Sequence, residues 1–232
     1  MKYSRLLKAT SLTTFVSAAA AGLTLVVVEI AWPLWHDPHG AILVNWVFLA
    51  MVLGWVSGMI GCQQVLGIGF ATGASRKTMI LTQWTHGFVI AVSFSVLALL
   101  IQRVLKISGV KLASRVSSFP HFMAAGGMIN SLIYLTLLSL VAVAIGSLAG
   151  VGFIYLPSKV VVPALFIFMI MVVPLIMVIG MVGAFGVQQL WPGILTHAWV
   201  QLVGFAGLTA VLGLIDYLVY QHLDAPQNIR RR

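Results

Sequence analysis

Six long segments that carry almost no charge limit what this chain can fold into. A helix needs about 20 apolar residues, each adding about 1.5 Å, to cross a hydrocarbon layer of about 30 Å. Every one of the six segments is long enough, and apolar residues surround the helical circumference instead of forming one stripe. We therefore expect an all-α integral membrane protein with six transmembrane helices, at residues 11–32, 41–70, 79–102, 123–156, 160–187 and 194–220.

The overall composition supports a membrane environment. Of 232 residues, 61% are hydrophobic and 7% are charged, whereas soluble domains carry about 25% charged residues. We expect one membrane domain, 1–232, with lipid as a partner. The net charge of +9 does not indicate nucleic acid, because basic residues at the ends of spans are selected by anionic lipid and by membrane insertion. The single cysteine, Cys62, excludes an internal disulfide.

The basic residues predict the orientation of the chain. If both termini lie in the cytoplasm, most Lys and Arg residues fall on the inner side, as the positive-inside rule requires. The sequence therefore predicts an N-in, C-in topology. The third connector is an exception, and we expect it to form an amphipathic helix on the outer surface. Its basic residues are Arg103, Lys106, Lys111 and Arg115.

Glycine and proline predict where the helices end, bend or pack closely. Trp32-Pro33 is expected to end the first span, and Pro163 and Pro174 to bend the fifth. The second span is longer than a bilayer needs, so we expect it to tilt, break or project beyond the membrane, and its glycine-rich inner end is suited to a break. Pairs of glycines four residues apart allow close helix approach, either within one chain or across a dimer. These pairs are Gly54 with Gly58 and Gly146 with Gly150.

The connector between the second and third spans has the most distinctive local sequence. It reads Gly67-Ile68-Gly69-Phe70-Ala71-Thr72-Gly73-Ala74-Ser75-Arg76-Lys77-Thr78. Small residues allow a tight turn, and the Ser75 hydroxyl can cap a helix that starts at Arg76. An ordinary turn with cytoplasmic basic residues explains this pattern equally well.

This part of the sequence resembles the permease subunits of ABC exporters with six spans, the type V or ABC-2-like class. The resemblance lies in a long second span, a glycine-rich stretch and then Gly73-Ala74-Ser75-Arg76-Lys77-Thr78. The resemblance implies a short cytoplasmic coupling helix between spans two and three. It also implies a re-entrant outer connector between spans five and six, for which residues 180–193 are suitable. The residues that would receive the mechanical input from ATP hydrolysis are Thr72, Gly73, Ala74, Ser75, Arg76 and Lys77.

The same resemblance implies a function. The chain would be a multi-pass subunit of the cell membrane that pairs with a second permease subunit, in a homodimer or a related heterodimer, and with a cytoplasmic ABC ATPase. The sequence contains no Gly-x-x-x-x-Gly-Lys-Ser/Thr loop, so ATP and Mg would be bound by the ATPase. The subunit itself would be no enzyme and would need no cofactor. Its substrate could be an antimicrobial or amphipathic peptide, a drug or a lipid.

Two acidic residues fall inside predicted spans. A charge at the centre of a membrane helix costs about 2.5–3.5 kcal/mol on insertion scales, so such residues are candidates for function. Glu29, near the outer end of the first span, is a candidate for the lining of a translocation path. Asp216, near the inner end of the last span, is expected to act as an anchor at the inner interface.

Two other classes of function stay open at the level of sequence. One is a membrane scaffold or immunity-type protein that binds a partner without transport. The other is a b-type haem protein, in which histidines on different helices hold the iron at one depth. The latter is weakly indicated, because His86 and His197 fall near opposite ends of their spans.

Overall fold

The computed structural model describes residues 3–36, 46–107, 118–155, 163 and 198–223. Within these ranges the chain is helical and has no strand. The helices are α1 (Tyr3–His36), α2 (Trp46–Ala71), α3 (Arg76–Ile107), α4 (Ser118–Tyr155) and α7 (Ala198–His222). Four of them, α2, α3, α4 and α7, contain segments long and apolar enough to cross a membrane. The helical membrane character is therefore confirmed for this part of the chain.

The predicted fifth span and the predicted re-entrant connector lie outside the described residues, apart from Pro163. Of the other predicted spans, each overlaps one observed helix. The observed helices α1, α3 and α4 start before the predicted spans, because apolarity marks the part that lipid surrounds and not the whole hydrogen-bonded helix.

Three local predictions about helix ends were wrong. Helix α1 continues past Pro33 to His36, because a proline in the last turn removes one backbone donor where few bonds remain to be lost. Helix α2 runs to Ala71 without the expected break, since Gly58, Gly61 and Gly69 are held by tight packing. Helix α3 extends to Ile107, so Arg103 and Lys106 belong to it and not to a separate surface helix, while Lys111 and Arg115 lie outside the described residues.

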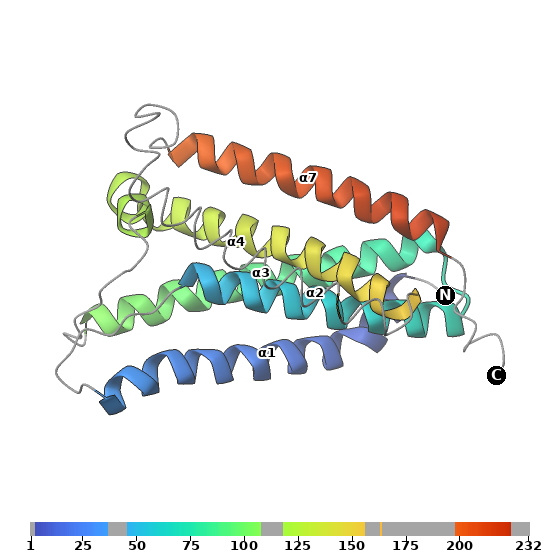
Figure 1. Ribbon diagram of the computed structural model, residues 1–232, viewed down its shortest axis with the longest axis horizontal. Coiled ribbons are helices and arrows are strands. Elements are labelled where there is room, and N and C mark those ends of the chain that lie inside the picture. Colours follow the sequence, from blue (N-terminus) through green and yellow to red (C-terminus); the bar gives the residue numbers. More distant parts are fainter. Residues whose placement is uncertain (1–2, 37–45, 108–117, 156–162, 164–197, 224–232) are drawn as a thin grey trace.

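The helices lie side by side in one elongated bundle, in which α4 and α7 run in the same direction (Figure 1). Helix α2 packs against α1, α3 and α4, and α7 packs against α4 and α3. The start of α1, the turn between α2 and α3, and the ends of α4 and α7 all lie at one end of the bundle. We call this the connector end.

Glycines allow the backbones of α2 and α4 to approach closely, because no glycine side chain separates them. We call this contact the glycine seam. Gly58 on α2 lies against the carbonyl of Val143, and Gly146 on α4 lies against the carbonyl of Trp55. A Cβ at Gly150 would lie 2.9 Å from the Met59 carbonyl oxygen. Small residues that bring backbones together are a principal means of helix association in lipid, where apolar burial gives little driving force. The predicted glycine pairs are therefore used for packing within the chain.

Buried side chains form a cluster near each end of the bundle. At the connector end the cluster draws on all five described helices and contains Leu6, Cys62, Val65, Leu66, Met79, Ile80, Val151 and Tyr220. Large apolar side chains such as Leu12, Phe88 and Leu214 are exposed. A protein surrounded by water rarely tolerates such exposure over a large area, but lipid accommodates it.

Candidate functional site at the connector end

The turn between α2 and α3 is fixed by backbone hydrogen bonds. Gly73 has a φ of 65°, in the left-handed region where glycine carries no steric penalty. The Ala74 N–H donates to the Gly69 carbonyl at 2.8 Å, and the Gly73 N–H donates to the Phe70 carbonyl at 3.3 Å. This pair of bonds is the Schellman motif, which satisfies the last carbonyls of a helix. The end of α2 is therefore rigidly defined.

Ser75 caps the start of α3, as its sequence predicted. The Thr78 N–H donates to the Ser75 hydroxyl oxygen at 3.2 Å, and the two hydroxyl oxygens lie 2.8 Å apart. An N-cap serine satisfies one of the amide groups that have no partner at a helix start. The C-terminal motif of α2 and the cap of α3 thus follow one another directly.

The predicted coupling helix is not a separate element. Only residues 72–75 separate α2 from α3, and all four belong to the two capping motifs. No room is left for a further turn of helix. Arg76 and Lys77 instead form the first turn of α3. We call residues 72–77 the connector.

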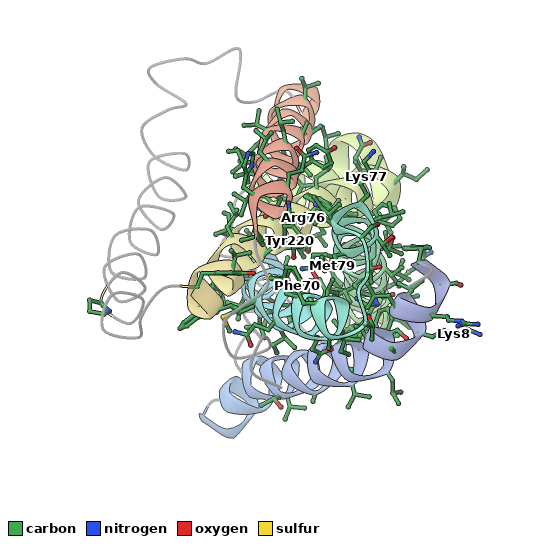
Figure 2. The ribbon with its side chains drawn as sticks, turned by 90° about the vertical axis from the view of Figure 1, so that its right-hand side faces the viewer. Lys8, Phe70, Arg76, Lys77, Met79 and Tyr220 are labelled. Atoms are coloured by element: carbon green, nitrogen blue, oxygen red, sulfur yellow. The ribbon has the colours of Figure 1, made fainter. Side chains whose placement is uncertain are left out.

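The connector is exposed at the end of the bundle, apart from the partly buried Ala74. Figure 2 looks onto this end and shows Arg76 and Lys77 near α7, while Met79 and Phe70 lie toward the centre of the bundle. The Arg76 guanidinium donates to the carbonyl of Gln221, in the last turn of α7. Cations favour this position because the last carbonyls of a helix are partly negative.

Side-chain packing below the connector also joins α2, α3 and α7. The Met79 side chain lies directly on Gly69, so a larger residue at position 69 would displace it. Met79, Leu66 and Tyr220 belong to the buried cluster at the connector end. Residues of α2, α3 and α7 therefore meet beneath the exposed turn.

A second set of contacts holds α1 to this end of the bundle. The Tyr3 and Thr85 hydroxyl oxygens lie 2.7 Å apart, and the Thr14 hydroxyl donates to the Gln64 side-chain carbonyl at 2.8 Å. His86 Nε2 lies 3.4 Å from the Thr10 hydroxyl. Such bonds between membrane helices contribute about 0.6 kcal/mol each on average. The first helix is thus joined to α2 and α3 by polar contacts at several depths.

Gln83 joins α3 to the glycine face of α2. Its side-chain amide donates to the Gly58 carbonyl at 2.9 Å. Its Oε1 would lie 2.9 Å from a Cβ at Gly61, so the missing side chain at position 61 makes space for the amide. The glycines of α2 therefore allow close packing of two neighbouring helices, α4 at the glycine seam and α3 at Gln83.

Asp216 occupies a different environment from the one predicted. Its side chain is 1% exposed, whereas an anchor at the interface would contact water. Electrostatic interactions connect Asp216 with Ser147 of α4, Cys62 of α2 and Tyr220 of α7. The prediction failed because position along the sequence gives depth but not the side of the helix that faces the bundle. We call these four residues the Asp216 cluster.

Two of the three partners of Asp216 could not have been found from the sequence. Cys62, Ser147 and Tyr220 are common residue types in membrane helices, and they come from segments far apart in the chain. A search for polar residues four positions apart would have paired Asp216 with Tyr220 on one face of α7. The contributions of α2 and α4 required the fold.

The other predicted site residue, Glu29, lies on α1, and its side chain is not among those described. Within the described ranges, no group of three or more His, Cys, Asp or Glu side chains is placed to hold a metal ion. The connector and the Asp216 cluster are thus the two features that the described residues offer for function. No protein-family model, curated protein or solved structure matches this chain.

Proposed function

We propose that this chain is the membrane-spanning subunit of an ATP-driven exporter, with six spans, both termini in the cytoplasm and a separate ATPase bound at the connector. Two permease subunits, identical or related, would enclose the translocation path between them. The proposal rests on the resemblance of the Gly73–Thr78 sequence to six-span exporter permeases and on the geometry of the connector.

The observation that carries the proposal is the rigid attachment of an exposed connector to three helices. The Schellman motif fixes the connector to α2, the Ser75 cap fixes it to α3, and Arg76 joins it to α7. A partner that displaces the connector would move all three helices together. Such a rigid lever is what conversion of ATP hydrolysis into alternating access requires.

The distribution of charge supports the proposed orientation. Arg5 and Lys8 near the start of α1 lie at the same end of the bundle as Arg76 and Lys77. Basic residues next to spans favour the cytoplasmic side. They also favour a partner with an acidic surface, because complementary charge accelerates and orients association.

The division of chemistry follows from this arrangement. ATP and Mg would be held by the ATPase, and this subunit would contribute the path and the connector. Glu29 stays our candidate for a residue that lines the path. The substrate would be an amphipathic or antimicrobial peptide, a drug or a lipid.

The proposed binding of the ATPase at the connector can be tested by reversing the charge of one residue. We expect the native complex, purified in mild detergent, to contain an ATPase subunit that hydrolyses ATP. The Lys77→Glu variant is expected to lose that subunit, because an acidic partner surface would repel the new carboxylate. Arg103→Glu is the matched control, since it reverses an exposed charge at the opposite end of the same helix.

The readout is the amount of ATPase polypeptide and of ATP hydrolysis retained per permease chain. Loss with Lys77→Glu and retention with Arg103→Glu would support the proposal. Equal retention in both variants would reject the connector as the docking site. Purification of the native protein without any ATPase would reject the exporter assignment and favour a membrane scaffold.

A further inference from the structure

The Asp216 cluster is a deeply buried polar group that contains a carboxyl group. Cys62 and Ser147 are 0% exposed, and Asp216 and Tyr220 are 1% exposed. Within the described part of the chain, three of its oxygen atoms have no hydrogen-bond partner: Asp216 Oδ1, Ser147 Oγ and the Tyr220 hydroxyl oxygen. Buried polar atoms without partners are uncommon in native proteins and call for a specific explanation.

No cation from the described part of the chain compensates a charge on Asp216. Helix α2 contributes Cys62 and α4 contributes Ser147 to its surroundings. Tyr220, one turn further along α7, is the other titratable group. From α1 and α3, the neighbouring cluster contains the apolar residues Leu6, Met79 and Ile80. The guanidinium of Arg76 donates a hydrogen bond to the Gln221 carbonyl instead.

The burial of Asp216 restricts what could neutralise it. An ionised carboxylate in an apolar interior without a paired cation is strongly unfavourable. Hard metal cations need about six oxygen ligands, but the cluster offers one carboxylate and two hydroxyl groups. A proton requires no additional ligand and no space. The protonated carboxyl group also has an O–H that can donate a hydrogen bond to the neighbouring Ser147 hydroxyl oxygen.

We propose that Asp216 is an intramembrane proton-binding site. The carboxyl group holds a proton while α7 is packed against α2 and α4. When α7 separates from α4 and water enters, the O–H bond breaks, the proton passes to water and the carboxylate is left hydrated. Opening therefore releases a proton and becomes easier as the pH rises. This inference does not depend on the exporter assignment.

The small number of acidic residues makes the site directly observable. The chain contains four Asp and Glu residues, namely Glu29, Asp37, Asp216 and Asp224. A protonated carboxyl group has a C=O stretching band that carboxylates lack, and infrared spectra of the purified full-length chain in lipid can detect it. We expect this band at neutral pH, we expect it to persist in Glu29→Gln, and we expect Asp216→Asn to remove it.

A second variant protects the test against misfolding of Asp216→Asn. Ser147→Ala keeps the carboxyl group but removes a neighbour, so the band is expected to remain and to shift in frequency. Helix content by circular dichroism verifies the fold of each variant. Absence of the band from the native protein, its persistence in Asp216→Asn, or an unshifted band in Ser147→Ala would each overturn the proposal.

Proton release can be followed independently through Cys62, the single cysteine of the chain. Its thiol is buried beside Asp216, so reaction with a maleimide requires the cluster to open. We expect native protein to react faster than Asp216→Asn at alkaline pH and at the same rate at acidic pH. Comparison at equal pH removes the intrinsic effect of thiol ionisation. Equal rates at every pH would contradict coupling between opening and proton release.

Discussion

Arg76, the first residue of α3, donates a hydrogen bond to the backbone carbonyl of Gln221, in the last turn of α7. The two residues are 145 positions apart in the sequence. Their contact joins the exposed connector to a helix that also contains Asp216. Both features that the described residues offer for function are therefore connected through one helix.

Removal of the guanidinium is expected to weaken the end of α7. In Arg76→Gln the cation near the last carbonyls is lost, and such a cation contributes about 0.3–1 kcal/mol at an exposed helix end. We expect a small decrease in thermal stability in detergent, measured as the temperature at which Cys62 becomes reactive to a thiol-specific dye.

Lys77→Gln is the control for this change, because it removes the adjacent exposed cation. We expect it to leave the unfolding temperature unchanged. A larger decrease for Lys77→Gln than for Arg76→Gln would show that general charge at this end, and not the contact with Gln221, determines stability.

The glycine seam predicts very different effects for two chemically identical substitutions on α2. Gly58→Ala places a methyl group against the backbone of Val143, which cannot move without shifting α4. Overpacking of this kind typically costs about 1–3 kcal/mol. Gly67→Ala places the methyl group where nothing lies within 4 Å, and alanine favours a helix by up to about 1 kcal/mol.

Thermal unfolding followed by Cys62 labelling distinguishes the two glycines. We expect Gly58→Ala to unfold at a lower temperature than the native protein and Gly67→Ala at the same or a higher temperature. If both substitutions behaved alike, the close approach of α2 and α4 would not be a determinant of stability.

The sequence was sufficient for features that depend on local chemistry. Apolar length located every described helix, because backbone groups in lipid must be satisfied within a helix. The Ser75 cap followed from the serine before Arg76, and close packing followed from the spacing of Gly54 and Gly58. Each of these depends on residues a few positions apart.

Features that depend on the arrangement of helices could not be predicted. The connector was expected to contain a helix, but the capping motifs of α2 and α3 meet without intervening residues. Asp216 was assigned to the interface, because hydropathy does not show which face of α7 turns toward α4. The contacts of Cys62 and Ser147 with it arise only when three distant segments are packed together.

The attachment of α1 can be measured with a double-mutant cycle. The Thr14 hydroxyl donates to Gln64 at 2.8 Å, so Thr14→Val and Gln64→Leu each remove one partner. We expect each single variant to destabilise the protein and the double variant to lose less than the sum. The coupling energy should be about 0.6 kcal/mol, with an upper value of about 1.7 kcal/mol, as for other bonds between membrane helices. Strict additivity would mean that the contact does not stabilise the bundle.

The same substitution, tyrosine to phenylalanine, is expected to have opposite effects at Tyr3 and at Tyr220. The Tyr3 hydroxyl has a partner, Thr85, at 2.7 Å, so Tyr3→Phe should reduce stability by about 0.6 kcal/mol. The Tyr220 hydroxyl is buried and has no hydrogen-bond partner among the described residues, and its removal eliminates an unsatisfied group. Tyr220→Phe should therefore be neutral or stabilising, as measured by Cys62 labelling during thermal unfolding. A loss of stability in Tyr220→Phe as large as that in Tyr3→Phe would show instead that the Tyr220 hydroxyl forms a hydrogen bond within the Asp216 cluster.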